Sequence, residues 1–231
     1  MSTTMPKQPR RKPQPTRRLS ARFWANTIVI ALAFIVVIVI VLVGRAQSAS
    51  KQDAAPAVVR ADSRILQKAP TDKVTVVEFL DFECEACGAA YPVVEQLREQ
   101  YKDRVTFIAR YFPIPSHKNA MNAAMAAEAA GRQGKFTEMY SKLFQTQTQW
   151  AERQDDQSTV LRSVAESLGL DMRQYDKDIA DPTLRIRVMK DQTDGVQLGV
   201  AGTPTFFLNG EKLTLTSTEQ FAAELEKAWR R

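Results

Sequence analysis

The chain of 231 residues has room for one ordinary domain together with some accessory segments. Its formal net charge of +6 invites comparison with nucleic-acid-binding proteins, but residues 1–22 alone carry seven basic and no acidic side chains, which leaves the remainder at −1. This distribution excludes a strongly basic domain, and we expect no nucleic-acid partner.

The first segments of the chain predict a membrane anchor. Residues 1–22 are rich in Pro, Arg, Lys, Ser and Thr, a composition typical of a disordered tail. Residues 23–44 contain no charged side chain, and a helix of about 20 apolar residues crosses a bilayer. We therefore expect a single transmembrane helix at 23–44, with the basic tail in the cytoplasm and the rest of the chain outside. A cleaved signal peptide is the alternative, because small residues follow at 46–49, although the apolar stretch of a signal peptide is shorter, about 7–15 residues.

The composition of residues 45–70 differs from that of the segment after them and indicates a spacer before a folded domain. Residues 45–70 are rich in Ala, Ser, Gln and charged residues without a clear apolar period, which is typical of a linker, although part of it could pack on the domain. The domain is expected at 71–231. Its predicted elements, in chain order, are a buried strand at 74–82, a helix at 85–101, a strand at 105–112, a mostly helical block at about 116–198, a strand at 205–208, a turn at 209–210, a short run at 212–215 and a helix from Ser217. This order indicates an α/β fold with a strand, helix, strand unit of the parallel type at its start.

Cys84 and Cys87 are the only cysteines of the chain and stand between the first strand and the first helix of the domain. At a helix N-terminus, the exposed backbone N–H groups and the helix dipole favour the thiolate of Cys84, which is the form that attacks a disulfide. Cys87 lies one turn further on the same helical face, where it can pair with Cys84 or resolve a mixed disulfide. The spacing therefore predicts a redox-active pair.

Two other uses of these cysteines agree less well with the sequence. A purely structural disulfide across three positions closes a very short loop and constrains the unfolded chain little. A structural zinc site takes four ligands, mostly Cys and His, whereas this chain has two cysteines and one histidine, His117. A closed zinc site would need carboxylates or a second chain, so we expect no metal. His117 lies in a predicted loop and is not included among the catalytic residues.

Further segments extend the pattern around the cysteines. They are Glu78-Phe-Leu-Asp-Phe82 before Cys84-Glu-Ala-Cys87, Ala126-Ala-Glu-Ala-Ala130 and Gln133-Gly-Lys-Phe136 in the helical block, and Val200-Ala-Gly-Thr-Pro-Thr-Phe206 after it. With these residues the sequence resembles the thioredoxin superfamily, and more closely its DsbA-like branch, over about residues 71–231. The resemblance implies a thioredoxin fold with an inserted helical domain, here preceded by the N-terminal transmembrane helix.

The resemblance also implies roles for individual residues. Cys84 is implied to be the nucleophile and Cys87 the resolving thiol, and their disulfide is the redox group, without a separate cofactor. Pro204 is implied to be a cis proline beside the cysteines, and the backbone of Thr203 to hydrogen-bond an extended substrate. Glu78 is implied to be a buried acid that moves protons near Cys87. The alternative for Glu78 is a strand-end carboxylate that faces water, because a buried, unpaired carboxylate is costly.

The residues around Cys84 depart from those of the strong oxidants in this family. Those proteins commonly carry Pro-His between the cysteines, whereas this chain has Glu85-Ala86, and Glu83 also flanks Cys84. Nearby negative charge disfavours a thiolate, which predicts a raised pKa of Cys84 and a milder oxidant. The helix dipole has the opposite effect on that pKa, and the sequence leaves the balance open.

These observations favour a membrane-anchored, extracytoplasmic enzyme, a protein disulfide oxidoreductase of the thioredoxin superfamily. It is expected to form or exchange disulfides in secreted or envelope proteins through Cys84 and Cys87. The expected partners are cysteine-containing clients and, by the resemblance, a DsbB-like or vitamin K epoxide reductase-like membrane protein that re-oxidises the pair. Two alternatives stay open: a membrane-tethered reductase or isomerase, and a module that binds a metal or unfolded clients through its thiols.

Overall fold

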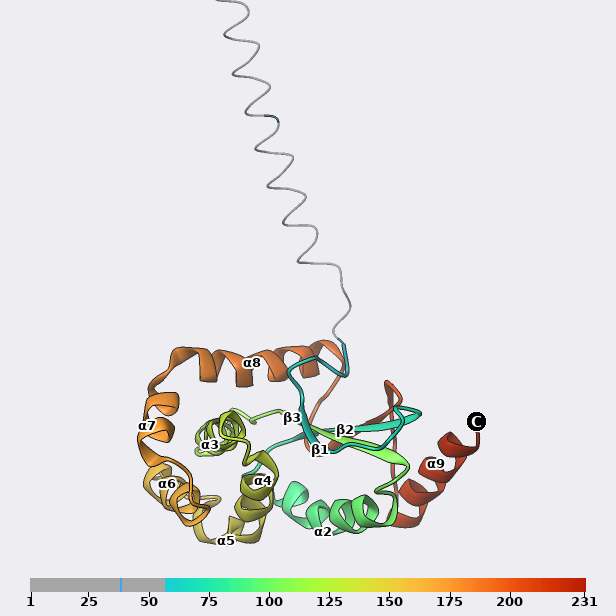
Figure 1. Ribbon diagram of the computed structural model, residues 1–231, viewed down its shortest axis with the longest axis horizontal. Coiled ribbons are helices and arrows are strands. Elements are labelled where there is room, and N and C mark those ends of the chain that lie inside the picture. Colours follow the sequence, from blue (N-terminus) through green and yellow to red (C-terminus); the bar gives the residue numbers. More distant parts are fainter. Residues whose placement is uncertain (1–37, 39–56) are drawn as a thin grey trace, which may run out of the picture. The chain divides into compact units, whose positions relative to one another are not determined.

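A mixed sheet with the strand order β1-β3-β2-β4-β5 forms the centre of the fold (Figure 1). The computed structural model describes residue 38 and residues 57–231, and the latter belong to one compact unit. β2 and β3 are parallel, whereas β1 on β3, β4 on β2 and β5 on β4 are antiparallel. The strands are β1 (Arg64–Gln67), β2 (Val74–Leu80), β3 (Val105–Tyr111), β4 (Thr205–Leu208) and β5 (Glu211–Lys212).

Helices connect and cover this sheet. The described helices are α2 (Glu85–Gln100), α3 (Ala120–Arg132), α4 (Phe136–Gln145), α5 (Gln147–Trp150), α6 (Ser158–Ser167), α7 (Met172–Ala180), α8 (Pro182–Gln197) and α9 (Thr218–Arg230). The predicted strand, helix, strand unit is confirmed as β2-α2-β3. The helices α3 to α8 all lie between β3 and β4 in the chain, within the segment at about 116–198 that the sequence predicts to be mostly helical. The side chains of Asp171, Asp181 and Ser217 cap α7, α8 and α9 by accepting backbone N–H groups.

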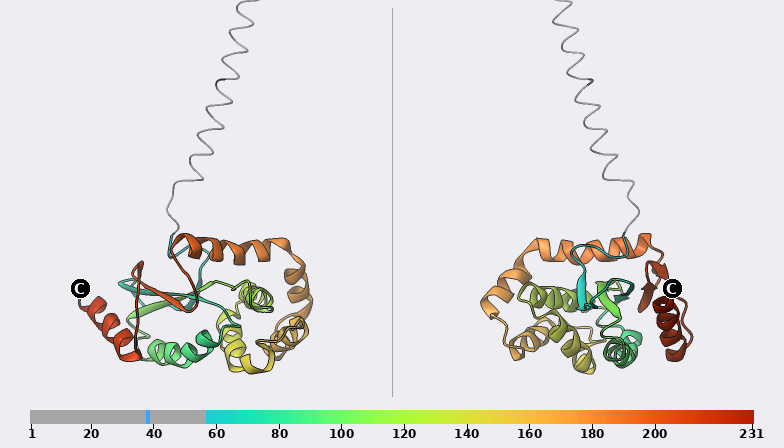
Figure 2. Two further views of the ribbon diagram at one scale, coloured as in Figure 1. Left: turned by 180° about the vertical axis from the view of Figure 1, so that it is seen from behind. Right: turned by 45° about the vertical axis from the view of Figure 1, so that its right-hand side comes forward.

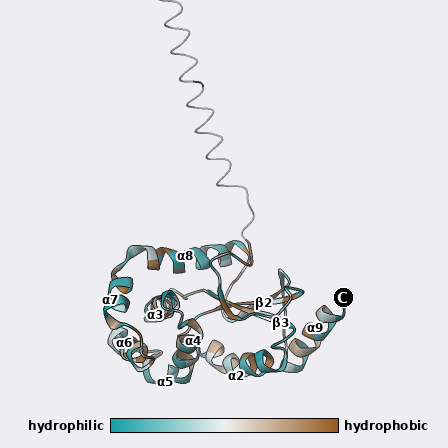
Figure 3. Ribbon diagram, in the orientation of Figure 1, coloured by the Kyte–Doolittle hydropathy of each residue, from teal (hydrophilic) through white to brown (hydrophobic). Residues whose placement is uncertain are grey.

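The sheet is covered on both faces because the side chains of its central strand alternate. Val76 and Leu80 of β2 belong to a large buried cluster that includes side chains of α2, α9 and the inserted helices. Val77 and Phe79 belong to a smaller cluster on the other face. Figures 1 and 2 show α8 on one side of the sheet and α2 and α9 on the other. Brown, apolar residues gather on the central strands in Figure 3, whereas the helices carry both teal and brown residues.

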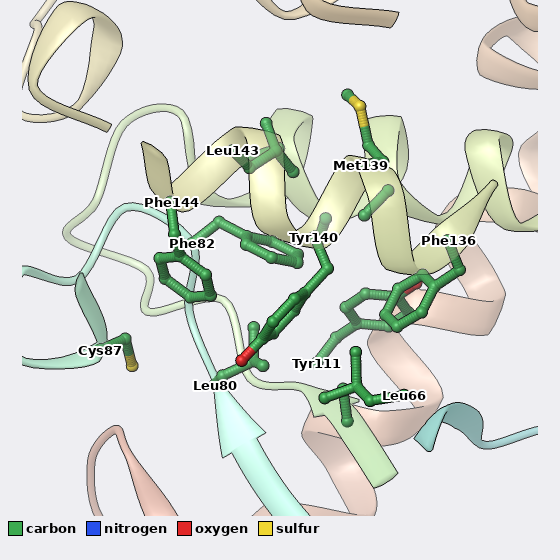
Figure 4. Close-up of a cluster of buried hydrophobic side chains, with 14 of the residues drawn as sticks. Leu66, Leu80, Phe82, Cys87, Tyr111, Phe136, Met139, Tyr140, Leu143 and Phe144 are labelled. Carbon is green, nitrogen blue, oxygen red and sulfur yellow. The ribbon is translucent and has the colours of Figure 1, made fainter. Parts of the chain in front are cut away.

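An aromatic cluster holds the inserted helix α4 against the end of β2 (Figure 4). Phe82, two residues after β2, lies 5.1 Å from Phe144 and 6.0 Å from Tyr140, measured between ring centroids. Tyr91 of α2 stacks on Phe144 at 5.2 Å. Each such pair adds about 0.5–1.5 kcal/mol beyond the burial of its area. The insertion is thereby fixed to the segment that carries the cysteines.

The structure extends the sheet into the segment predicted as a spacer. β1 lies within residues 45–70 and pairs with β3. Arg64 of β1 bonds the Glu128 carboxylate, which also accepts a hydrogen bond from the Tyr111 hydroxyl at 2.9 Å. Only one position of this short strand, Leu66, is fully buried, so its sequence shows no apolar alternation. The predicted run at 212–215 shares only Lys212 with β5, which begins one residue earlier and ends there.

The predicted basic tail at 1–22 and the predicted anchor at 23–44 lie outside the described residues, apart from Ile38. Among the helices that the structure does describe, none combines the length and the apolarity needed to cross a bilayer. The membrane anchor therefore stays a prediction from sequence.

Candidate active site

The two cysteines lie where β2 ends and α2 begins. Cys84 is the N-cap residue of α2, with φ −68° and ψ 123°, and Cys87 sits in the first turn of the helix. Both are free thiols in the structure. The exposed fraction falls from 9% at Cys84 to 0% at Cys87, which Figure 4 shows beside the buried aromatic side chains. The two sulfurs therefore differ in access as well as in position.

The surroundings of Cys84 stabilise its thiolate. The pKa of Cys84 is lowered to about 5, and the largest cause is a hydrogen bond from the Cys87 thiol. Thr203 and the backbone N–H groups of Cys87 and Ala86 lower the pKa further, while burial acts in the opposite direction. These N–H groups are among those that a helix leaves unpaired at its N-terminus. Of the two thiols, Cys84 is therefore the one that ionises more readily.

The pKa of Cys87 is shifted in the opposite direction. Its pKa is raised well above that of an ordinary thiol, first by burial and then by its hydrogen bond to Cys84 and by the negative charge of Glu78. A protonated Cys87 can donate its hydrogen to the Cys84 sulfur, so the same arrangement lowers one pKa and raises the other. The pKa values of the two neighbouring thiols are therefore shifted in opposite directions.

The loop before β4 lies next to the Cys84 sulfur. The Thr203–Pro204 peptide bond is cis, as the family resemblance implies. The Cys84 Sγ lies 3.4 Å from the carbonyl oxygen of Thr203. An open hollow of about 460 Å³ adjoins this loop and is lined by Ala201, Gly202, Thr203, Pro204, Thr205, Phe206, Lys212, Leu213 and Leu215. The residues predicted to bind an extended substrate therefore lie at the reactive sulfur, beside a space open to solvent.

Glu78 is buried, with an exposed fraction of 3%, so the water-facing alternative is wrong. Its pKa is raised to about 8, first by burial and then by the charge of Glu95, while Arg98 acts in the opposite direction. The Oε2 atom of Glu78 has no hydrogen-bond partner. Because its charge raises the pKa of Cys87, the carboxyl lies within electrostatic reach of the resolving thiol. Glu78 thus has the position and the near-neutral pKa of a group that exchanges protons there.

The acids that flank Cys84 do not raise its pKa, contrary to the expectation from sequence. Glu85 and Ala86 are exposed at the start of α2, and Glu85 is not among the causes that act on the Cys84 thiol. Glu83 is buried, and its carboxylate accepts the backbone N–H groups of Asn119, at 2.6 Å, and of Glu152, at 3.0 Å. These bonds hold the Glu83 charge toward the helical insertion. The helix N-terminus and the neighbouring thiol therefore decide the ionisation of Cys84.

A second acid shapes the turn before Cys84. The Asp81 carboxylate accepts the N–H groups of Glu83, at 2.8 Å, and of Ile114, at 2.9 Å, and lies 2.7 Å from Nδ1 of His117. Burial raises the pKa of Asp81, although these hydrogen bonds oppose the change. Asp81 and His117 thus fix the loop that carries the cysteines to the loop that opens the insertion. His117 supports the site and does not contact a thiol.

The sequence reasoning missed Gln147, a residue of α5 in the insertion. Its Nε2 atom donates hydrogen bonds to the carbonyl oxygens of Phe82, at 2.8 Å, and Cys84, at 2.9 Å. A single glutamine in a helical block carries no motif, and 60 residues of chain separate it from the cysteines. Nothing in the sequence could have found it without the fold.

A metal site needs several Cys, His, Asp or Glu side chains close together. Within residues 57–231, no three Cys, His, Asp or Glu side chains form a group that could hold a metal ion. The thiols are paired with each other and with backbone groups, so the geometry supports thiol chemistry.

The sheet order and the two free thiols at the N-terminus of α2 are the features of a thioredoxin-type protein. The family model described as thioredoxin matches residues 65–227, and the chain belongs to the thioredoxin family.

Solved structures of other proteins share this fold. Alpha-DsbA1 of Wolbachia pipientis is 19% identical, with a TM-score of 0.66 over 74% of this chain and 93% of that one. BdbD of Bacillus subtilis is 21% identical, with a TM-score of 0.64 over 73% and 94% of the two chains. A thioredoxin-like oxidoreductase of Silicibacter pomeroyi is 24% identical, with a TM-score of 0.64 over 78% and 99%. At these identities the likeness concerns the fold.

Curated relatives of higher identity are much longer proteins. The Na(+)/H(+) antiporter NhaA 1 of Mycobacterium sp. (strain KMS) is 33% identical over 146 residues, which are 62% of this chain and 23% of that protein. The NhaA 1 of Salinispora arenicola is 40% identical over 141 residues, or 60% and 20%. The chain thus spans about a fifth to a quarter of the length of these relatives, and their antiport activity is a property of those proteins.

Proposed function

We propose that this protein donates disulfides to cysteine-containing secreted or envelope proteins on the outer side of the cytoplasmic membrane. The observation that carries the proposal is the opposed ionisation of the two thiols, with the pKa of Cys84 lowered to about 5 and that of Cys87 raised. A thiolate stabilised in the reduced protein makes reduction of the Cys84–Cys87 disulfide favourable. Such a protein takes electrons from its clients and leaves them oxidised.

The exchange proceeds in two displacements. A client thiolate attacks the Cys84 sulfur of the oxidised pair, the Cys84–Cys87 bond breaks, and the electron pair leaves on the Cys87 sulfur. A second client thiolate then attacks the client sulfur of the mixed disulfide and releases Cys84 as a thiolate. The client loses two electrons and gains a disulfide, and the protein ends with two reduced cysteines. Cys84 is a good leaving group in the second step because its pKa is low.

Glu78 supplies the proton that the first step requires. The leaving Cys87 sulfur has a high affinity for a proton because it is buried. Glu78 has a pKa of about 8, so it is largely protonated at neutral pH and can deliver a proton toward Cys87. Its unpartnered Oε2 atom leaves it free to do so, directly or through water.

The Thr203–Pro204 loop is the proposed binding site for the client backbone. The carbonyl oxygen of Thr203 lies 3.4 Å from the Cys84 sulfur, so a client strand bound along this loop brings its own sulfur to the site of attack. The adjoining hollow of about 460 Å³ can receive neighbouring client side chains. Unfolded clients of many sequences can bind in this way, because the contacts are mainly to backbone.

The proposed location rests on the sequence. The uncharged stretch at 23–44 behind a basic tail supports an uncleaved anchor with the catalytic domain outside. The enzyme then needs an oxidant, and we propose a membrane protein of the DsbB-like or vitamin K epoxide reductase-like kind that passes electrons on to a quinone. Intact-mass analysis of the membrane-extracted protein tests the anchor, since cleavage after residues 46–49 would remove it.

The reduction potential tests the direction of electron flow. The full chain in mild detergent is equilibrated in glutathione buffers, and the reduced fraction is trapped with a thiol reagent. A potential near about −120 mV supports a disulfide donor, whereas a potential near about −270 mV assigns the protein to the reductases. The measurement is repeated at a second detergent concentration, and an unchanged potential shows that the micelle does not affect it.

Trapping of intermediates tests the roles of the two cysteines. Cys87→Ser should accumulate a mixed disulfide with ribonuclease A that carries scrambled disulfides, because the Cys84 thiolate attacks a client disulfide, a client thiolate leaves, and the thiol that would resolve the product is gone. Cys84→Ser should form none, because the buried Cys87 remains protonated. A mixed disulfide through Cys87 in the Cys84→Ser variant would reverse the assignment.

A further inference from the structure

Gln147 links the helical insertion to the backbone of the reactive cysteine. It belongs to α5, and its Nε2 atom donates to the carbonyl oxygens of Phe82 and Cys84 at 2.8 and 2.9 Å. Two carbonyl acceptors require an N–H₂ donor, so these contacts also fix which end of the side-chain amide faces the loop. The side chain thus bridges the residues on either side of Glu83.

The Cys84 carbonyl has a second donor that sets the direction of α2. The Gly88 N–H bonds this oxygen at 3.0 Å and closes the first turn of the helix. Because the Gly88 N–H and the Gln147 amide both bond this oxygen, they restrain the orientation of the peptide plane that follows Cys84. The N–H groups of Ala86 and Cys87, which lower the pKa of Cys84, are in that same turn. A side chain that fixes the orientation of the Cys84 carbonyl therefore also fixes the direction in which these N–H groups point relative to the Cys84 sulfur.

The Gln147 amide occupies the space that a side chain at position 88 would fill, and this space is free because residue 88 is a glycine. A Cβ atom on Gly88 would lie 2.0 Å from Oε1 of Gln147 and 2.9 Å from its Cδ atom. Real atoms do not approach so closely, so a side chain at position 88 and the observed Gln147 amide exclude each other. The chain thus provides two independent ways to remove the same contact.

We propose that Gln147 is a positioning residue, which sets the ionisation and the redox potential of Cys84 from within the helical insertion. It acts through the Cys84 carbonyl and the first turn of α2, without touching the sulfur. The inference rests on the proposed function in that Cys84 is the attacking thiol. It gives the insertion a chemical part in the reaction, in addition to covering the core.

The first test compares Gln147→Ala with Gln149→Ala in the full chain in mild detergent. Gln149 is exposed on the same helix and serves as the matched control. Loss of one hydrogen bond corresponds to about a fivefold change in an equilibrium. Gln147→Ala should lower the thiolate-to-thiol ratio of Cys84 at fixed pH about fivefold, measured by thiolate absorbance. The reduction potential should become more negative by about 20 mV, since a tenfold change corresponds to 29.6 mV.

The second test uses Gly88→Ala alone and together with Gln147→Ala. Alone, the added Cβ should displace the glutamine and raise the pKa of Cys84 as Gln147→Ala does. In the Gln147→Ala background, Gly88→Ala should change that pKa no further and should stabilise α2, because Ala is the better helix former. Equal shifts from Gly88→Ala in both backgrounds would show that Gln147 does not transmit the effect.

A merely structural role gives a different result. In that case Gln147→Ala lowers the urea midpoint of unfolding while the pKa and the potential stay at the values of Gln149→Ala, and the inference is overturned. Absorbance of the thiolate needs no client. If the pKa shifts as expected but the parent protein fails to oxidise ribonuclease A, the proposed function is wrong and the positioning role of Gln147 stands.

Discussion

Replacement of Glu78 by Gln should change how the stability of the protein depends on pH. The pKa of Glu78 is about 8 in the folded protein, against 4.5 for the free side chain. Between these values the folded state binds a proton that the unfolded state has lost, so the free energy of unfolding falls as pH rises. At pH 7 the difference of about 2.5 units above 4.5 corresponds to roughly 3 kcal/mol, at 1.36 kcal/mol per unit. Below pH 4.5 both states are protonated and the penalty is absent.

Urea unfolding of the reduced full chain in mild detergent, followed by near-ultraviolet circular dichroism at pH 4 and pH 7, measures this difference. Gln cannot ionise, so the advantage of Glu78→Gln over the parent should grow by about 3 kcal/mol between the two pH values. Subtracting the two proteins cancels all other titrating groups. Glu95→Gln is the matched control, since Glu95 raises the pKa of Glu78 from nearby and should change the slope much less. A difference that is flat with pH would refute the buried, near-neutral Glu78.

Three further outcomes are expected. Alkylation of Cys84 by iodoacetamide should follow pH with a midpoint near 5, while Cys87 should react only at far higher pH; equal midpoints in peptide mass spectrometry would contradict the asymmetry. Gly195→Ala should lower the free energy of unfolding by about 1–3 kcal/mol, because its Cβ would lie 2.7 Å from a ring carbon of Phe112, and an unchanged urea midpoint would argue against this packing. Glu83→Ala should lower the free energy of unfolding by about 1–3 kcal/mol, because the buried N–H of Asn119 and the part-buried N–H of Glu152 lose their acceptor, and protection of these amides in hydrogen exchange should fall with it.

The redox motif and its surroundings could be predicted from sequence because their signals are local. The apolar run of β2 predicts a buried strand, and the cysteines follow it where a helix must begin. The burial of Glu78 was expected from the family resemblance, and in the structure Glu78 lies with Val76 and Leu80 on the face of β2 that turns toward α2. Thr203 and Pro204 came only from the family resemblance, since nothing in their local sequence indicates that they approach Cys84.

The ionisation of Cys84 could not be predicted, because it depends on where other side chains turn. Glu83 is adjacent to Cys84 in sequence, yet its carboxylate is bonded to N–H groups of the insertion. Gln147 is distant in sequence, yet it bonds the Cys84 carbonyl. β1 was missed for the same reason, since Arg64 gains its partner, Glu128, only when α3 packs beside the sheet. The direction of the Glu83 carboxylate, the contact of Gln147 and the pairing of β1 all depend on tertiary contacts, which the sequence alone does not reveal.

The buried Arg110 has a mechanical consequence. Its guanidinium pairs with Asp191 and Asp194 of α8 at 2.6 Å each and also donates to the backbone oxygen of Ala57 at 2.8 Å. Arg110 thereby connects the start of the described chain to β3 and α8, on the side of the sheet opposite α2 (Figure 1). A pull along the chain from its N-terminal side is borne by these ion pairs and by the sheet. These contacts involve other residues than those that bond Cys84, which include Gln147, Gly88 and Thr203.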